Sequence, residues 1–116
     1  MDEGTPPGGK TTIAPDVLLN VATLTTLSTE GVSRLSAPPG GVNRLWKRGH
    51  QSEGVRIELL EDTVDVDLYL ILKPDVNVRQ VSRKVQKSVS RAIAEMVGME
   101  PGKINIHIED IDFEEI

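Results

Sequence analysis

One segment of this sequence restricts the fold more than any other, because its apolar side chains alternate with other residues over nine positions. From residue 64 to residue 72 every second residue is Val or Leu, while Asp65, Asp67 and Tyr69 lie between them. A period of two is the signature of a β-strand that buries one face. We therefore predict a strand that turns one face toward a core and the other toward solvent.

The neighbouring segments predict further strands. Residues 55–59 alternate in the same way, and a short acidic turn at Glu61 and Asp62 joins them to residues 64–72, which predicts an antiparallel hairpin. Isoleucines alternate with polar residues between 104 and 109, and a short strand candidate spans 32–36. Together these segments predict a sheet of about four strands.

A long helix is predicted from Asn77 to Val97, because apolar residues recur there every three or four positions. Gly98 follows and can end the helix. The apolar set is Val78, Val81, Val85, Val89, Ala92, Ile93 and Met96. On a helical wheel the opposite side carries four cations, which we call the basic strip: Arg83, Lys84, Lys87 and Arg91.

A first helix is predicted from Pro15 to Thr29, with Gly31 just beyond its end. The spacing assigns the core-facing stripe to Val17, Val21, Leu24 and Ser28, flanked by Leu18 and Thr25. No residue from Val17 to Thr29 is charged, so the outer face lacks the charges that usually meet water; this face consists of Leu19, Thr23, Thr26 and Leu27. It predicts a surface that binds another protein or a second copy, unless the loop at 37–54 covers it.

These elements predict an α/β protein of the α+β type, with one small mixed sheet and both helices packed on one of its faces. Residues 1–10 are rich in Gly and Pro and are expected to form a flexible leader. Residues 11–111 are expected to form a single domain, and residues 112–116 an acidic tail.

Composition excludes several classes of function. The chain has no cysteine, hence no thiol nucleophile, disulfide or thiolate metal site. Its longest apolar segment, residues 68–72, is far shorter than the roughly 20 residues of a membrane-spanning helix. The acidic N-terminal residues do not resemble a secretory signal, so we expect a cytoplasmic protein.

Catalytic or metal chemistry has little support. The only histidines are His50, in the predicted loop, and His107, which shares a predicted sheet face with Asp65, Asp67 and Glu109. This grouping lacks a recognised ligand spacing, so cross-strand pairing on a solvated face is the better interpretation than a metal site. We expect no catalytic residues, no cofactor and no bound metal.

Two basic regions leave the binding partner open. Residues 37–54 contain Arg44, Trp46, Lys47 and Arg48, and together with the basic strip they suggest a nucleic-acid-binding module as the alternative function. The strip could also attract an anionic membrane surface, bind an acidic protein, or simply be hydrated. Acidic residues on the sheet and in the tail oppose wrapping around a polyanion, so nucleic acid ranks below protein as a partner. The apolar face of the second helix is needed by the core and does not suit direct membrane insertion.

The order of these elements resembles the alkaline shock protein family of bacterial envelope-stress proteins. The resemblance rests on the segments VDVDLYLIL, NVRQVSRKVQKSVSRAIAEMVGM and INIHIEDI, together with TTIAPDVLLNVATL and EGVSRL, and it spans roughly residues 11–111. It implies a small cytoplasmic α/β protein with no known catalytic activity; some relatives are held at the inner face of the cell membrane by a separate membrane-embedded partner. Two positions depart from the family pattern: Ala14 replaces the usual helix cap, and Lys73-Pro74-Asp75 replaces a glycine after the long strand.

We therefore expect a non-enzymatic cytoplasmic adaptor or scaffold that acts in cell-envelope stress or homeostasis through protein contacts near the membrane. The expected partner is an integral membrane or membrane-associated protein, and self-association into a homo-oligomer is a further expectation. The first helix is predicted to carry the protein interface, and the second an accessory electrostatic one.

Overall fold

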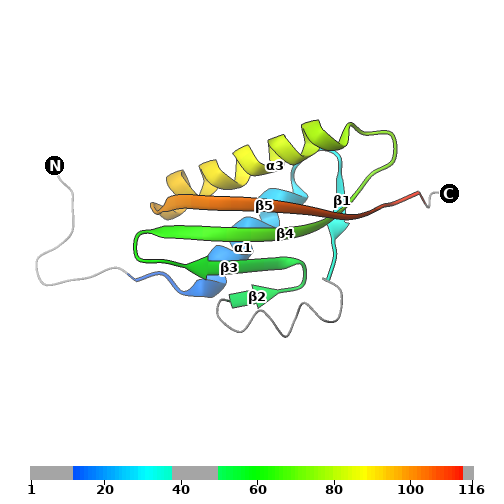
Figure 1. Ribbon diagram of the computed structural model, residues 1–116. Helices are drawn as coiled ribbons and strands as arrows, with labels where there is room; N and C mark the ends of the chain where they lie inside the picture. Colours follow the sequence, from blue (N-terminus) through cyan, green and yellow to red (C-terminus); the bar gives the residue numbers. More distant parts are fainter. Residues whose placement is uncertain (1–11, 38–49, 114–116) are drawn as a thin grey trace, which may run out of the picture.

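Two helices and a five-stranded mixed sheet make up the part of the chain that the computed structural model describes, residues 12–37 and 50–113 (Figure 1). The predicted α+β fold is confirmed, with one strand more than expected. In chain order the elements are α1 (Pro15–Leu27), β1 (Val32–Leu35), β2 (His50–Ser52), β3 (Val55–Leu59), β4 (Thr63–Leu72), α3 (Val78–Ala92), the π-helical turn η1 (Ile93–Val97) and β5 (Glu100–Ile111).

The central strand is β4, which pairs with three others. β5 runs parallel to it, whereas β3 and β1 pair with its two halves in antiparallel register. At Tyr69 the partner changes: its N–H donates to the Gly54 carbonyl (2.9 Å), and its carbonyl accepts from the Ser36 N–H (2.8 Å). The N–H and C=O of one strand residue point to the same side of the strand. The strands β3 and β1 therefore lie end to end along one edge of β4, and β5 lies along the opposite edge.

The predicted hairpin is confirmed as β3 and β4, with Val55 opposite Leu68 and Leu59 opposite Val64. The additional strand is β2, which pairs with β3. The expectation that His50 lies in a loop is therefore wrong, because it begins β2; three polar residues, HQS, carry no alternation that a sequence pattern could reveal. The basic cluster at 44–48 and the leader at 1–10 lie outside the described residues.

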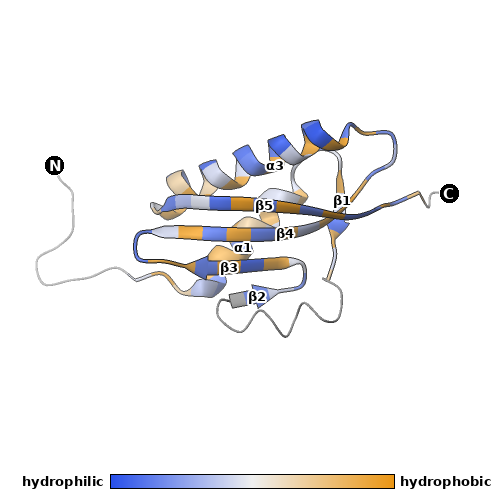
Figure 2. Ribbon diagram, viewed as in Figure 1, coloured by the Kyte–Doolittle hydropathy of each residue, from blue (hydrophilic) through white to orange (hydrophobic). Residues whose placement is uncertain are grey.

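The core lies between the helices and one face of the sheet. The even-numbered residues of β4, from 64 to 72, are fully buried, and the alternation of apolar and polar positions is visible along the strands (Figure 2). From α3 and η1, Val81, Val85, Val89 and Ile93 face this core. The predicted second helix is confirmed, although Val78 and Met96, at the two ends of its apolar set, are 42% and 71% exposed.

The first helix is confirmed in position but not in orientation. Its buried side chains are Leu18, Leu19, Ala22 and Thr26, whereas Val17 and Leu24, which were assigned to the core, are 46% and 65% exposed. At 100° per residue the true core stripe is turned by roughly 140° from the predicted one. The prediction was wrong because an uncharged helix has no strongly polar face to set its orientation.

Candidate functional site

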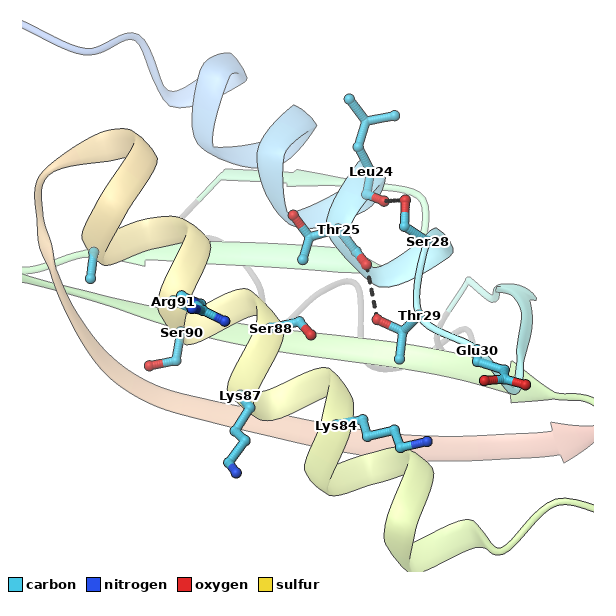
Figure 3. A pocket seen from close by; sticks show the side chains of 11 residues that line it. Leu24, Thr25, Ser28, Thr29, Glu30, Lys84, Lys87, Ser88, Ser90 and Arg91 are labelled. Carbon is cyan, nitrogen blue, oxygen red and sulfur yellow. Dashed lines mark hydrogen bonds between the residues drawn. The ribbon is translucent and has the colours of Figure 1, made fainter.

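An open groove of about 930 Å³ runs between α1 and α3 on the helical side of the molecule (Figure 3). We call it the α1–α3 groove. The α1 side is lined by Leu24, Thr25, Ser28, Thr29 and the adjoining Glu30; the α3 side by Lys84, Lys87, Ser88, Ser90 and Arg91, with Ala94 of η1 beyond them.

The α1 wall of the groove has one apolar side chain, Leu24, among hydroxyl-bearing residues and Glu30. The Leu24 side chain is exposed at the rim of this wall, where it points away from α3 (Figure 3). The nearby hydroxyls are used within the helix, since Ser28 Oγ donates to the Leu24 carbonyl (2.8 Å) and Thr29 Oγ1 to the Thr25 carbonyl (3.0 Å), as the dashed lines in Figure 3 mark. These two hydroxyl hydrogens are therefore used within the helix and are not available to a ligand.

The α3 wall is cationic and weakly compensated. Arg91 Nε lies 3.4 Å from Glu95 Oε2, but both side chains are mostly exposed, so this ion pair contributes little. Within residues 12–37 and 50–113, no carboxylate lies at ion-pair distance from Lys84 or Lys87. The groove thus combines three cations with one exposed leucine and one carboxylate, Glu30. This excess of positive charge suits a segment with acidic and apolar side chains.

Of the four residues predicted for the partner face of α1, two are buried and two are accessible. Leu19 and Thr26 are 7% and 0% exposed, so the prediction that they lie on an outer face is wrong. Thr23 and Leu27 remain accessible and line a smaller hollow of about 380 Å³ beside β1. The α1 side that does reach the groove, at Leu24, was missed because its spacing is equally typical of a core stripe.

All four residues of the basic strip are exposed, as the sequence predicted. Lys84, Lys87 and Arg91 line the groove, whereas Arg83 does not. Three cations of the strip and the Leu24 side of α1, which the sequence assigned to the core, therefore line one groove.

The open face of the sheet carries a polar cluster centred on Asp67. Its Oδ2 accepts from Arg56 Nη1 (3.1 Å), its Oδ1 accepts from Asn105 Nδ2 (3.1 Å), and His107 Nε2 lies 3.3 Å from Oδ1. The His107 ring stacks on Tyr69 with centroids 4.4 Å apart. These contacts join β3, β4 and β5 side by side, which is the cross-strand pairing that the sequence favoured.

Two observations bear on the chemistry of this face. Burial, followed by the nearby negative charges of Asp67 and Glu109, raises the pKa of Tyr69 above its usual 10.0, so the phenol stays protonated. Among the described residues, no group of three or more His, Asp or Glu side chains is arranged to hold a metal ion. Nor is any helix in this part of the chain long and apolar enough to cross a membrane.

Comparison with known proteins places this arrangement in a family. A profile of the alkaline shock protein 23 family, described as having a cell envelope-related function, matches residues 3–113. The protein YqhY of Bacillus subtilis (strain 168) is 30% identical over 108 residues, which are 91% of this chain and 79% of YqhY. The protein Spy1535 of Streptococcus pyogenes serotype M6 is 31% identical over 104 residues, 89% of this chain and 79% of its own length.

A similar fold occurs among solved structures. A structure of the MamM CTD superposes with a TM-score of 0.56, covering 82% of this chain and 95% of that chain. Only 15% of the aligned residues are identical, so the likeness concerns the fold alone.

Proposed function

Because this chain belongs to the alkaline shock protein 23 family, whose function is cell envelope-related, we propose that it is a non-enzymatic adaptor that holds a protein partner in the α1–α3 groove. The partner contributes a segment in which acidic side chains accompany at least one apolar side chain. The observation that supports this proposal is that the exposed Leu24 and the cations Lys84, Lys87 and Arg91 line the same groove.

The two walls have different roles in this proposal. An exposed ion pair contributes about 0.2–1 kcal/mol, so the cations mainly orient the partner and speed its approach. Covering a leucine side chain can contribute about 1.5–3 kcal/mol when it is fully exposed beforehand, so Leu24, already one-third covered, contributes less. We expect moderate affinity that weakens as salt is added, because salt screens exposed charges.

The proposed location is the cytoplasm, at the inner face of the cell membrane, where an integral membrane protein holds the adaptor. The proposed process is cell-envelope stress or homeostasis. The basic strip would assist, since each cation near an anionic surface adds about 1 kcal/mol of attraction that decays over about 8 Å. Insertion of the protein itself is not part of the proposal, because the apolar side of α3 is occupied by the core.

The experiment is affinity capture from the membrane fraction of cells that produce the protein. The test variant is Leu24→Asp with Lys87→Glu, and the matched control is Leu60→Asp with Glu61→Lys, which makes similar changes in the exposed β3–β4 turn. Circular dichroism establishes that both variants are folded. The proposal requires an integral membrane protein that wild type and control recover and the groove variant loses. Equal recovery by all three would overturn it.

Nucleic-acid binding is the competing function, favoured by the exposed and largely unpaired basic strip. It predicts recovery of RNA at near-physiological salt, with a steep salt dependence that Lys87→Ala and Arg91→Ala reduce. The acidic side chains of Glu58, Asp65 and Glu109 on the open face oppose it.

A further inference from the structure

The strand β5 leaves a long edge of the sheet open. It has 12 residues and, within the described residues, pairs only with β4, whereas the strand at the opposite edge, β2, has three. An open strand edge presents a row of backbone N–H and C=O groups that can pair with another chain. A short edge strand offers few such groups to another chain, whereas β5 is long.

The direction of the backbone groups on β5 that do not pair with β4 can be assigned. In a parallel pair, residues whose N–H and C=O point to the neighbouring strand alternate with residues whose groups point away. The Ile104 carbonyl accepts from Gln86 Nε2 of α3 (3.0 Å), so it points away from β4. Ile106 and Ile108 follow with the same direction, because no register shift falls between Ile104 and Ile108.

The sequence along this edge would match a second copy of itself that runs in the opposite direction. It reads Lys-Ile-Asn-Ile-His-Ile-Glu from 103 to 109. In an antiparallel pair of two such strands centred on Ile106, Ile104 lies opposite Ile108, and Lys103 lies opposite Glu109 at both ends. Residues with outward-pointing backbone groups then face one another, as an antiparallel ladder requires.

We propose that a second copy of this chain docks on the edge of β5, in antiparallel register centred on Ile106. The sheet becomes continuous across both copies. Lys103 and Glu109 are exposed and form two symmetric cross-strand ion pairs, while the half-buried isoleucines at the rim of the core cover their counterparts. The contact is isologous, so it closes at two copies rather than growing into a filament.

This arrangement has a consequence for the groove. A two-fold axis that makes edge strands antiparallel is perpendicular to the sheet, so the helices of both copies lie on the same side of it. Two α1–α3 grooves would face the same direction and could engage two partner segments together, with a gain in avidity. The dimer itself is independent of what the groove binds.

The first test is a charge-reversal cycle on the full chain, read by sedimentation equilibrium. Lys103→Glu and Glu109→Lys each convert both cross-strand ion pairs of the dimer into pairs of like charge. Each variant should therefore raise the dimer dissociation constant by about tenfold. The double variant restores opposite charges in reversed order and should return it close to the wild-type value. A monomeric wild type, or single variants with unchanged dissociation constants, would overturn the proposal.

The second test determines the register of the two strands. It does not depend on whether the charge variants fold. The chain has no cysteine, so Ile106→Cys introduces a single thiol that lies opposite its own copy at a separation a disulfide can span. Mild oxidation should give a covalent dimer with Ile106→Cys and none with the control Leu60→Cys. Equal cross-linking of the two would contradict the assigned register. Loss of partner capture by the groove variant is a separate result, so the two proposals can fail independently.

Discussion

The helices α1 and α3 cover the same face of the same sheet, yet the sequence predicts the orientation of one and not of the other. The helix α3 buries Val81, Val85 and Val89 as its spacing predicted, while α1 is turned so that Leu24 leaves the core and Leu19 enters it. Both have regularly spaced apolar residues. Only α3 also has charges opposite them. Apolar spacing therefore identified the buried side where charges marked the opposite side, and failed where they did not.

The same difference produces the site. The outer side of α3 carries cations that stay hydrated, and the outer side of α1 carries no charge from Val17 to Thr29. Where the two outer sides meet, they form a groove with one basic wall and one wall of hydroxyl-bearing residues, Leu24 and Glu30. Neither helix shows this site alone.

The largest expected effect tests the helix that the sequence predicts well. Val85→Asp places a carboxyl group at a fully buried position and should cost about 3–5 kcal/mol, much of the roughly 5–15 kcal/mol that stabilises a domain. Chemical denaturation measures the loss. Lys84→Asp, one residue away on the exposed side, should cost under about 1 kcal/mol; similar losses for both variants would contradict the orientation of α3.

The second prediction tests the helix that the sequence misplaces. Leu18→Ala removes a side chain that is 1% exposed and should lower the free energy of unfolding by about 2–5 kcal/mol, because it leaves a cavity. Leu24→Ala should change it by less than about 0.5 kcal/mol. The stripe first predicted from the spacing contains Leu24 and has Leu18 only at its flank, so it requires a large loss from Leu24→Ala. One pair of urea titrations therefore decides between the two orientations.

The third prediction concerns the helix starts. Asn77 caps α3, since its side chain accepts from the Gln80 N–H (3.0 Å), whereas Ala14 gives α1 no side-chain cap. Asn77→Ala should cost about 1 kcal/mol, and Ala14→Ser should gain a similar amount. Thermal unfolding of both variants measures the difference. A stabilising Asn77→Ala or a destabilising Ala14→Ser would show that these termini are held in another way.

The smallest effect comes from a buried hydroxyl. Thr26 Oγ1 in α1 is fully buried and, within the described residues, has no hydrogen-bond partner. Thr26→Val keeps the shape and removes the unpaired group, so it should raise stability by up to about 1 kcal/mol. Thr25→Val, at a half-buried position on the groove side, is the control and should be close to neutral. A clear loss from Thr26→Val would mean that the hydroxyl is paired.

The sequence predicts most of the fold for identifiable reasons. The hairpin β3–β4 and the strand β5 follow from period-two alternation, which depends only on which face meets the core. The strand β2 could not be predicted, because its three polar residues pair through backbone groups alone. The cations of the site were found because charge identifies an exposed surface, whereas the position of Leu24 depends on packing against the sheet, which no helical wheel contains.

The central claim is that the α1–α3 groove receives a protein partner, and site-specific photo-cross-linking tests it most directly. A photo-reactive residue is placed at Leu24 in the groove or, as the control, at Leu60, which is 45% exposed and lies in the β3–β4 turn. After irradiation in cells, the cross-linked peptides are sequenced. The account predicts one dominant partner at position 24, joined through a segment with acidic and apolar side chains, and little product at position 60. The same products at both positions, or nucleic acid at position 24, would contradict it.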